Sequence, residues 1–384
     1  MSLIKAEYIW VDGTDPTPMI RGKTRLLDSG SLSGYESGLL KVEQIPIWGF
    51  DGSSTQQAEG NDSDRVLRPV AVYRDPFRNG ENENTHVLVL NEVHFPPRTG
   101  DTEEYGKVHE SNTRARLREV AGMYEALKFQ FGVEQEYTFM NLATGNPLGF
   151  PAGTSQPAPQ GPYYCSVGGG NVDGRAIMER HLDICAATGI PISGTNAEVM
   201  LGQWEYQMGH ETDPLTAADN LTMARYLMLR VAEEQGVGVS LEPKPMKGDW
   251  NGTGAHTNFS TEVMRKGGER FGGLVAAITS GLDISHKKHI DGYGAGNEER
   301  LTGKHETCDI DTFRAGVSDR GASIRIPWQV HVDGKGYLED RRPSGNMDPY
   351  TVFSLLMETV GSAQKAFVSP NGQVPRLETA PPAL

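Results

Sequence analysis

Phe131-Gly132-Val133-Glu134-Gln135-Glu136-Tyr137-Thr138-Phe139 is a run typical of a β-strand, with two glutamates at its centre. Side chains alternate between the faces of a strand, so Glu134 and Glu136 share one face. Two carboxylates this close repel each other unless a positive charge lies between them, and the apolar neighbours favour a buried strand. Mg²⁺ or Mn²⁺, which prefer oxygen ligands, would resolve the conflict. A solvated face of an edge strand explains the run equally well.

Strand and turn signals dominate the sequence before this run. Predicted strands lie at residues 8–11, 46–50 and 86–90. Residues 96–106 are polar and contain paired prolines, so we interpret them as a linker. The N-terminal part is therefore predicted to be a small β domain, residues 1–105.

Helical periodicity enters the sequence after the linker. Predicted helices lie at residues 117–127, 214–234 and 348–359, and further strands at 131–140, 237–241, 256–260 and 322–330. Asp213 and Pro214 suit the start of the second helix, and Gly236 suits its end. We therefore predict an α+β fold with a larger domain at residues 106–367. Residues 368–384 are rich in Pro and Gly and are predicted to be a mobile tail.

Composition excludes several classes of protein. Among 384 residues, 36 basic side chains face 50 acidic ones, and this net charge of -14 argues against general nucleic-acid binding. The three cysteines, Cys165, Cys185 and Cys308, are widely spaced, which predicts free thiols in a reducing compartment. No apolar stretch is long enough for a signal core or a membrane span. We expect a soluble, cytoplasmic protein without a membrane partner.

The common nucleotide-binding motifs do not fit. Gly22-Lys23-Thr24 resembles the end of a P-loop, but Thr17 stands where the first glycine should be. The glycine-rich run at residues 168–174 does not match GxGxxG and is better interpreted as a loop. If ATP binds this chain, it binds in a less common way.

Further carboxylates and a histidine recur along the chain. Glu198 and Glu205 form a second acidic pair, His256 lies in a predicted strand, and Glu339 lies in a run of alternating charge. Taken singly, each has an ordinary explanation as a surface or core residue. Arginines, which suit carboxylates and phosphates, recur within the 43 residues from Arg300 to Arg342, among them Arg320, Arg325 and Arg341. Salt bridges would explain any one of them.

Several longer segments follow one another in a specific order. They are residues 48–55, 134–136, 161–165, 196–205, 244–252, 256–260, 300–307, 322–327 and 336–343. In this order they resemble glutamine synthetases of the type II class, from about Tyr8 to Thr359. The resemblance implies an N-terminal β-grasp domain and a catalytic domain with a curved antiparallel sheet and flanking helices. It also implies a homo-oligomer, typically a decamer of two stacked pentameric rings, with active sites between subunits.

The resemblance further assigns roles to individual residues. One Mg²⁺ or Mn²⁺ ion would be held by Glu136, Glu198 and Glu205, and a second by Glu134, His256 and Glu339. Residues that would contact glutamate or ammonium are Glu134, Asn251, Gly252, His256, Arg300, Arg341, Ser54 and Tyr164. Residues that would contact ATP are Asn258, Ser260, Arg320 and Arg325. The catalytic residues would be Asp51 from the neighbouring subunit, Glu306 on a flap, and Arg320.

The implied chemistry suits this inventory. ATP, the co-substrate, would phosphorylate the γ-carboxylate of L-glutamate, and ammonia would then displace phosphate to give glutamine. Metals and arginines are needed to bring a triphosphate and a carboxylate together. A carboxylate base is needed because ammonium enters as a cation and reacts as an amine.

Three other functions compete with this one. A γ-glutamyl-amine ligase would use an organic amine, but Asp51, Ser54, Tyr164 and Glu306 favour ammonia. A guanidino kinase would be expected to have a reactive cysteine and no β-grasp domain. A non-catalytic sensor of glutamine or nitrogen would release no phosphate.

Overall fold

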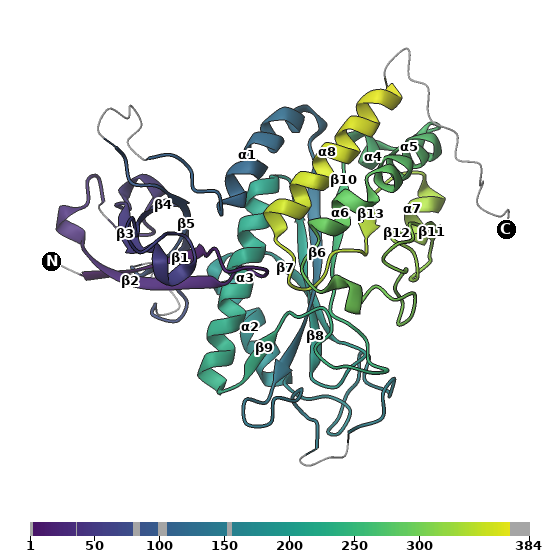
Figure 1. Cartoon of the computed structure of the whole chain (residues 1–384), viewed down its shortest axis with the longest axis horizontal. Helices are drawn as coiled ribbons and strands as arrows, with labels where there is room; N and C mark the ends of the chain where they lie inside the picture. The colour runs from purple at the N-terminus through teal and green to yellow at the C-terminus, as the bar shows by residue number, and fades with distance from the viewer. Residues whose placement is uncertain (1–2, 36, 80–84, 99–105, 152–155, 369–384) are drawn as a thin grey trace. The chain divides into compact units, whose positions relative to one another are not determined.

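The computed structural model describes residues 3–35, 37–79, 85–98, 106–151 and 156–368 (Figure 1). Contacts divide the chain into two compact units. The first holds residues 1–116, 180–191 and 222–227, and the second holds the remainder. Most of the predicted linker (residues 99–105) and the tail from residue 369 lie outside the described residues. The domain boundaries at 105 and 367 therefore stay a prediction.

The first unit contains a five-stranded sheet in the order β2-β1-β5-β4-β3. Its strands are β1 (Leu3–Val11), β2 (Ile20–Asp28), β3 (Trp48–Asp51), β4 (Asp64–Arg74) and β5 (Val87–His94). The central pair, β1 and β5, is parallel, and the other pairs are antiparallel. The three strands predicted in this region are confirmed, whereas β2 and β4 were not predicted.

Aromatic packing secures the core of this sheet. Tyr8 and Trp10 alternate into the core from β1. The Tyr8 ring packs edge-on against Trp48 at 5.2 Å, and the Trp10 ring packs against Phe50 at 4.9 Å. The Tyr8 hydroxyl donates to the Pro46 carbonyl at 2.6 Å. These contacts fix the start of β3, and therefore the segment that carries Asp51.

The second unit is built on an eight-stranded sheet in the order β11-β12-β13-β10-β6-β8-β7, with β9 also paired to β6. Its strands are β6 (Gln130–Met140), β7 (Ile192–Ala197), β8 (Gln203–Glu211), β9 (Gly238–Ser240), β10 (Ala255–Ser260), β11 (Ala315–Val317), β12 (Ile324–Ile326) and β13 (Leu338–Asp340). All pairs are antiparallel except β11 with β12. The strand that carries Glu134 and Glu136, β6, therefore lies inside the sheet and not at its edge.

Helices follow and separate these strands. They are α1 (Thr113–Tyr124), α2 (Arg175–Thr188), α3 (Pro214–Gln235), α4 (Glu262–Lys266), α5 (Phe271–Ile284), α6 (His286–Asp291), α7 (Trp328–Asp333) and α8 (Pro349–Val368). Short 3-10 helices are η1 (Ser29–Ser31), η2 (Val42–Gln44), η3 (Gly52–Thr55), η4 (Glu125–Leu127) and η5 (Asn297–Glu299). The Phe131 ring of β6 stacks on Phe353 of α8 at 4.1 Å. One face of β6 is thus covered by α8, beside α5 (Figure 1).

One predicted strand is wrong in its second half. Residues 322–330 were expected to be one strand, but β12 ends at Ile326 and α7 begins at Trp328. Pro327 lies between them, and its missing N–H prevents continuation of the strand pairing. The helix predicted at 348–359 is confirmed and continues to Val368.

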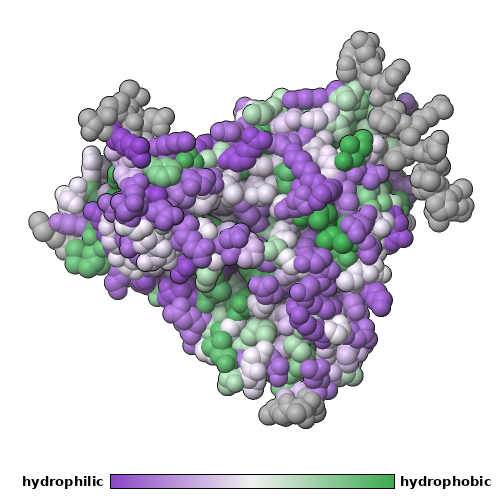
Figure 2. All heavy atoms as spheres, viewed as in Figure 1, coloured by the Kyte–Doolittle hydropathy of each residue, from purple (hydrophilic) through white to green (hydrophobic). Residues whose placement is uncertain are grey.

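On the face shown in Figure 2, hydrophilic side chains predominate and hydrophobic ones form small separate groups. Among the described residues, no helix has the length and apolar character needed to cross a bilayer.

Candidate active site

The site begins on the face of β6 that α8 does not cover. Alternation puts Phe131 on the α8 face and Glu134 and Glu136 on the other. The antiparallel register then sets His256 of β10 opposite Glu134, and Glu205 of β8 opposite Glu136. Directly opposed residues lie within side-chain reach, so one strand organises two clusters.

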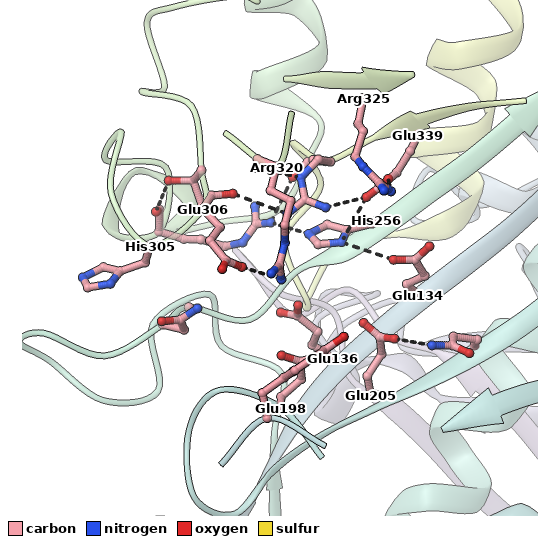
Figure 3. A pocket seen from close by; sticks show the side chains of 17 residues that line it. Glu134, Glu136, Glu198, Glu205, His256, His305, Glu306, Arg320, Arg325 and Glu339 are labelled. Atoms are coloured by element: carbon pink, nitrogen blue, oxygen red, sulfur yellow. Dashed lines mark hydrogen bonds and ion pairs between the residues drawn. The ribbon is translucent and has the colours of Figure 1, made fainter. Parts of the chain in front are cut away.

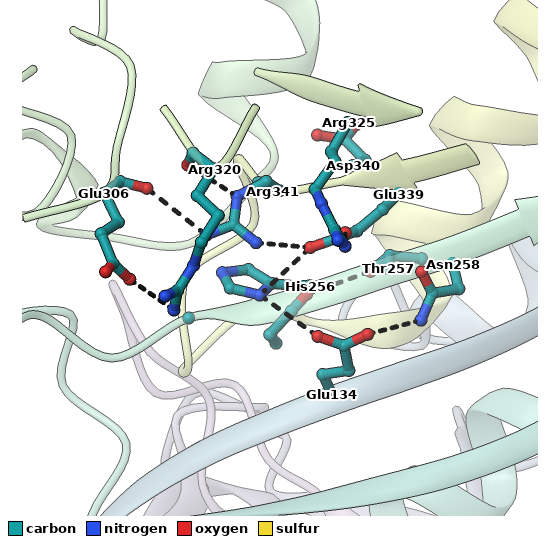
Figure 4. Close-up of polar contacts among 12 residues, drawn as sticks. Glu134, His256, Thr257, Asn258, Glu306, Arg320, Arg325, Glu339, Asp340 and Arg341 are labelled. Atoms are coloured by element: carbon teal, nitrogen blue, oxygen red, sulfur yellow. Dashed lines mark hydrogen bonds and ion pairs between the residues drawn. The ribbon is translucent and has the colours of Figure 1, made fainter. Parts of the chain in front are cut away.

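The first cluster contains Glu134, His256 and Glu339. His256 Nδ1 lies 3.5 Å from Glu134 Oε2 and 3.6 Å from Glu339 Oε1, beyond the usual hydrogen-bond length (Figure 4). Asn258 Nδ2 donates to the other Glu134 oxygen at 2.9 Å. Burial, reinforced by the charge of Arg341, lowers the pKa of His256 well below its ordinary value. A neutral imidazole facing two carboxylates is a donor set that suits a divalent cation.

The second cluster contains Glu136, Glu198 and Glu205. Asn196 Nδ2 and the Val199 N–H donate to Glu198 at 2.9 and 3.1 Å. Even so, burial raises the pKa of Glu136 and of Glu198, and it raises the pKa of Glu205 to about 8. Mutual repulsion among these carboxylates adds to the effect. Two buried carboxylates and one partly buried carboxylate repel one another when ionised, and a divalent cation among them would offset that repulsion.

Both clusters meet a simple test for a metal. In each, one ligand atom from every residue lies within 4.8 Å of the others. The second cluster offers only carboxylate oxygens, which suit Mg²⁺ or Mn²⁺. The first adds one imidazole nitrogen to two carboxylates, a mixed set that suits a divalent transition-metal ion. The residues present therefore fit two divalent ions.

Arginines balance the acidic clusters. Glu339 is paired with Arg325 at 2.7 Å and with Arg341 at 2.5 Å. Arg300 is buried and donates to His256 Nε2 at 3.1 Å and to the Arg341 carbonyl at 2.9 Å. Its burial lowers the pKa of Arg300 to about 10. Gly254 makes room for it, because a Cβ at that position would come within 2.5 Å of Arg300 Nη2.

A loop carrying Glu306 lies beside these arginines. Glu306 Oε2 pairs with Arg320 Nη2 at 2.5 Å, and Arg341 Nη2 donates to the Glu306 carbonyl at 3.4 Å. Figure 3 shows Glu306 pointing toward Arg320, and His305 pointing away from the carboxylates. The Arg320 guanidinium also lies over the Tyr164 ring at 5.9 Å.

Most of these side chains line one cavity of about 350 Å³ within the second unit. The predicted residues that line it are Glu134, Glu136, Tyr164, Glu198, Glu205, Asn251, Gly252, His256, Arg300, Glu306, Arg320, Arg325, Glu339 and Arg341. Three lining residues, Gln207, His305 and Thr307, were not assigned a role from the sequence. Alternation along β8 could have found Gln207, because it shares the face of Glu205 and donates to it at 2.7 Å.

Four predicted residues do not line this cavity in the described chain. Asn258 and Ser260 follow His256 along β10, and Asn258 reaches Glu134. Asp51 and Ser54 belong to the first unit. Asp51 is exposed and accepts hydrogen bonds from the Ser53 hydroxyl at 2.6 Å and N–H at 2.9 Å, which lower the pKa of Asp51. It is an ionised carboxylate at neutral pH.

Comparison with known proteins identifies the family of the chain. Residues 4–96 match the family described as "Glutamine synthetase, beta-Grasp domain", and residues 110–271 match "Glutamine synthetase, catalytic domain". A glutamine synthetase of Streptomyces hygroscopicus is 52% identical over 356 residues, which cover 93% of this chain and 96% of the relative. One of Frankia alni is 47% identical over 379 residues, covering 99% and 98%. A cytosolic isozyme of Pinus sylvestris is 46% identical over 356 residues, covering 92% of each.

These matches confirm the predicted fold class. The β-grasp domain matches the part of the chain that forms the first sheet, and the catalytic domain matches the part that begins the second. The relatives come from bacteria and from eukaryotes. Since both domains and nearly the whole length match, the chain belongs to the glutamine synthetase family and has the activity of a glutamate–ammonia ligase.

Proposed function

We propose that the cavity in the second unit is the site of ligation, where its carboxylates hold metal ions and its arginines bind the anionic substrates. The observation that carries this proposal is the arrangement on β6, where Glu134 and Glu136 each anchor a separate cluster of potential metal ligands. Glutamate and ATP are both anionic, and the surrounding arginines offer the complementary charge.

Glu136, Glu198 and Glu205 hold one divalent ion, and Glu134, His256 and Glu339 hold another. We take both to be Mg²⁺ or Mn²⁺. When bound, these ions neutralise phosphoryl and carboxylate charge and so lower the barrier to phosphoryl transfer. His256 stays neutral for this role because it is buried beside arginines.

Glutamate lies at the arginine end of the cavity. Arg300 and Arg341 bind its carboxylates, with Asn251 and the backbone at Gly252 completing the contacts. Arg320 and Arg325 orient the γ-phosphoryl group of ATP, with Asn258 and Ser260 nearby on β10. The buried Arg325 Nε has no hydrogen-bond partner among the described residues, so a phosphate oxygen can accept from it.

The reaction proceeds in two steps. A γ-carboxylate oxygen attacks the terminal phosphorus of ATP, which breaks the bond to ADP and gives γ-glutamyl phosphate. Ammonium binds among Ser54, Tyr164, Glu306 and Asp51, and the Asp51 carboxylate takes one of its protons. The resulting ammonia attacks the acyl carbon, the bond to the phosphate oxygen breaks, the departing phosphate takes the extra proton of the new amine, and glutamine forms. Glu306 closes the site so that water does not react in place of ammonia.

The site further requires a second copy of the chain. Asp51 and Ser54 are on the first unit, and we propose that they come from a neighbouring subunit in a homo-oligomer, a decamer of two pentameric rings. We also propose a cytoplasmic location, since relatives from Pinus sylvestris and Drosophila melanogaster are named cytosolic or cytoplasmic. The free cysteines agree with that location.

Phosphate release tests the residue roles. Purified protein is assayed with glutamate, ATP, Mg²⁺ and ammonium, omitting each in turn, beside Asp51→Ala and Glu306→Ala. We expect phosphate and glutamine in equal amounts only with all four components, and a large loss of activity in both variants. Better turnover with an organic amine would overturn ammonia as the substrate. Full activity of either variant would overturn that residue's role.

A further inference from the structure

The loop that carries Glu306 has an unusual backbone. His305 and Glu306 have φ values of 52° and 64°, so two consecutive residues with side chains adopt the left-handed conformation. This conformation is unfavourable for residues other than glycine and persists only where surrounding contacts hold it. The contacts of His305 and Glu306 therefore have to hold this backbone conformation.

On one side, active-site residues hold the loop through Glu306. Its carboxylate pairs with Arg320 at 2.5 Å, and its carbonyl accepts from Arg341. Both arginines line the cavity and are proposed to bind substrates. A substrate that binds Arg320 and Arg341 competes with Glu306 for these arginines. The contacts of Glu306 alone therefore cannot keep the loop in place during the reaction.

On the other side, two residues hold the loop through His305. Gln160 Nε2 donates to His305 Nδ1 at 3.2 Å, and His305 Nε2 donates to Asp249 Oδ1 at 3.3 Å. The two contacts demand one tautomer, with the proton on Nε2 and an accepting Nδ1. Neutral imidazole is favoured because burial lowers the pKa of His305. We call these two contacts the His305 latch.

Gln160 connects the latch to the substrate cavity. Its amide also donates to Asn251 Oδ1 at 2.7 Å and to the Asp249 carbonyl at 3.2 Å. Gln160 itself has a left-handed φ of 56°. One side-chain amide thus joins three segments: its own loop, the Asp249–Asn251 segment, and the loop carrying Glu306. None of these contacts involves a proposed metal ligand.

We infer that Gln160 and Asp249 are positioning residues, which hold His305 and thereby keep the adjacent Glu306 over the cavity while the acyl phosphate is present. This inference rests on the proposed role of Glu306. Because His305 and Glu306 are neighbours on one strained turn, freeing the His305 side chain frees the Glu306 carboxylate as well. Water can then attack the acyl carbon, the bond from that carbon to the bridging phosphate oxygen breaks, and glutamate and phosphate result. ATP is consumed without glutamine.

The ratio of phosphate released to glutamine formed measures this leak. Gln160→Met keeps the side-chain length but removes the donor. His305→Asn tolerates the left-handed backbone but is too short for either contact. Matched controls are Gln329→Met and His331→Asn, which alter exposed residues of α7 outside the cavity. A purely structural defect would lower activity without changing the ratio.

At limiting ammonium, we expect a phosphate-to-glutamine ratio above one for both latch variants and of one for wild type and controls. We also expect the KM for ammonium to rise about fivefold, the factor that the loss of one hydrogen bond gives, with kcat changed much less. The double variant should be no worse than the worse single variant, because both substitutions remove the same contact. A ratio of one in both variants, or independent effects in the double variant, would overturn the latch.

Glu306→Ala separates the two proposals. If it impairs coupling while the latch variants do not, the latch is wrong and the role of Glu306 stands. If Glu306→Ala leaves rate and ratio unchanged, the role of Glu306 is wrong, and the latch falls with it.

Discussion

At the scale of single residues, Glu339 links two arginines of the site to His256. It is only 1% exposed, pairs with Arg325 and Arg341, and faces His256 Nδ1. No neutral side chain can satisfy two guanidinium groups and also offer a metal an anionic oxygen.

We therefore predict that Glu339→Gln lowers kcat/KM at least about 100-fold and raises the Mg²⁺ concentration needed for half-maximal activity. Steady-state assays over a Mg²⁺ titration measure both effects. Glu242→Gln, an exposed residue outside the cavity, serves as the control and should behave as wild type. An unchanged Mg²⁺ requirement in Glu339→Gln would contradict the proposed ligand set.

A second residue-scale prediction concerns His181 in the first unit. Its Nε2 lies 2.9 Å from the Ala224 carbonyl and 3.1 Å from Cys185 Sγ, and burial lowers the pKa of His181 to about 4. The ordinary value is 6.5, so between pH 6.5 and pH 4 the unfolded chain takes up a proton that the folded chain does not. This contribution to stability is complete above pH 6.5 and is lost as the pH falls toward 4.

From pH 7 to pH 5, His181 should lower the free energy of unfolding by about 2 kcal/mol. The thermal midpoint of His181→Gln should consequently fall less over this range than that of the wild type. His331→Gln, which changes an exposed histidine, should keep the wild-type dependence. Equal pH dependence in all three proteins would rule out His181 as a source of acid sensitivity.

At the scale of elements, α3 illustrates how local signals set the ends of a helix. Asp213 Oδ2 accepts from the Thr216 N–H at 3.0 Å, Pro214 is the first helical residue, and Gly236 closes the helix with a φ of 67°. Asp213 accepts a hydrogen bond from a backbone N–H that has no partner inside the helix. Gly236 adopts the left-handed conformation that commonly ends a helix.

Asp213→Ala should destabilise the protein by about 1 kcal/mol, the usual cost of removing an N-cap. Activity at 25 °C should be unchanged, because Asp213 does not line the cavity. Thermal unfolding compared with Asp183→Ala, an exposed aspartate inside α2, isolates the cap from the loss of a charge. A midpoint no lower than that of Asp183→Ala would show that the cap contributes little.

The elements that could be predicted from the sequence are those with strong local signals. The α3 boundaries were predicted to within one residue because the capping residues act locally. β2 was missed because Arg21, Lys23 and Arg25 alternate along an edge strand with few apolar residues. β4 was missed because Pro69 interrupts it, where the pairing with β5 contains a bulge.

The candidate site, too, could be predicted from the sequence only in part. Alternation predicted that Glu134 and Glu136 share a face, which is confirmed, but the order of strands in the sheet decides what lies beside them. Only pairing of β6 with β10 and β8 brings His256 and Glu205 to those glutamates. Their roles came from the family resemblance, since long-range pairing leaves no local signal. Gln160 could not be found at all, because its contacts join loops distant in sequence.

At the scale of the whole molecule, the proposed groups are divided between the two units. Asp51 and Ser54 belong to the first, and the metal ligands and arginines to the second. If neighbouring subunits share each site, Asp51→Ala chains and Glu306→Ala chains can complement one another. A site can then combine the intact first unit of a Glu306→Ala chain with the intact second unit of an Asp51→Ala chain.

We predict that an equal mixture of these two inactive variants, dissociated and reassembled together, recovers about a quarter of wild-type activity, as random assembly of a closed ring requires. Sedimentation of the reassembled protein checks that the oligomer has re-formed. The control mixture is Glu306→Ala with Glu339→Gln, both in the second unit, which should recover none. Failure of the first mixture after full reassembly would show that each site belongs to one chain.

The placement of both clusters on β6 has a consequence for the design of inhibitors. Glu134 and Glu136 are two residues apart on an extended strand, so their Cα atoms are separated by about 6.6 Å. Because β6 is paired with a neighbouring strand on both sides, this separation is fixed. A single carboxylate is too small to span it. With a divalent ion proposed at each cluster, compounds that combine two metal-binding anionic groups at a matching separation should bind far more tightly than either group alone, and stiffening their linker should tighten binding further.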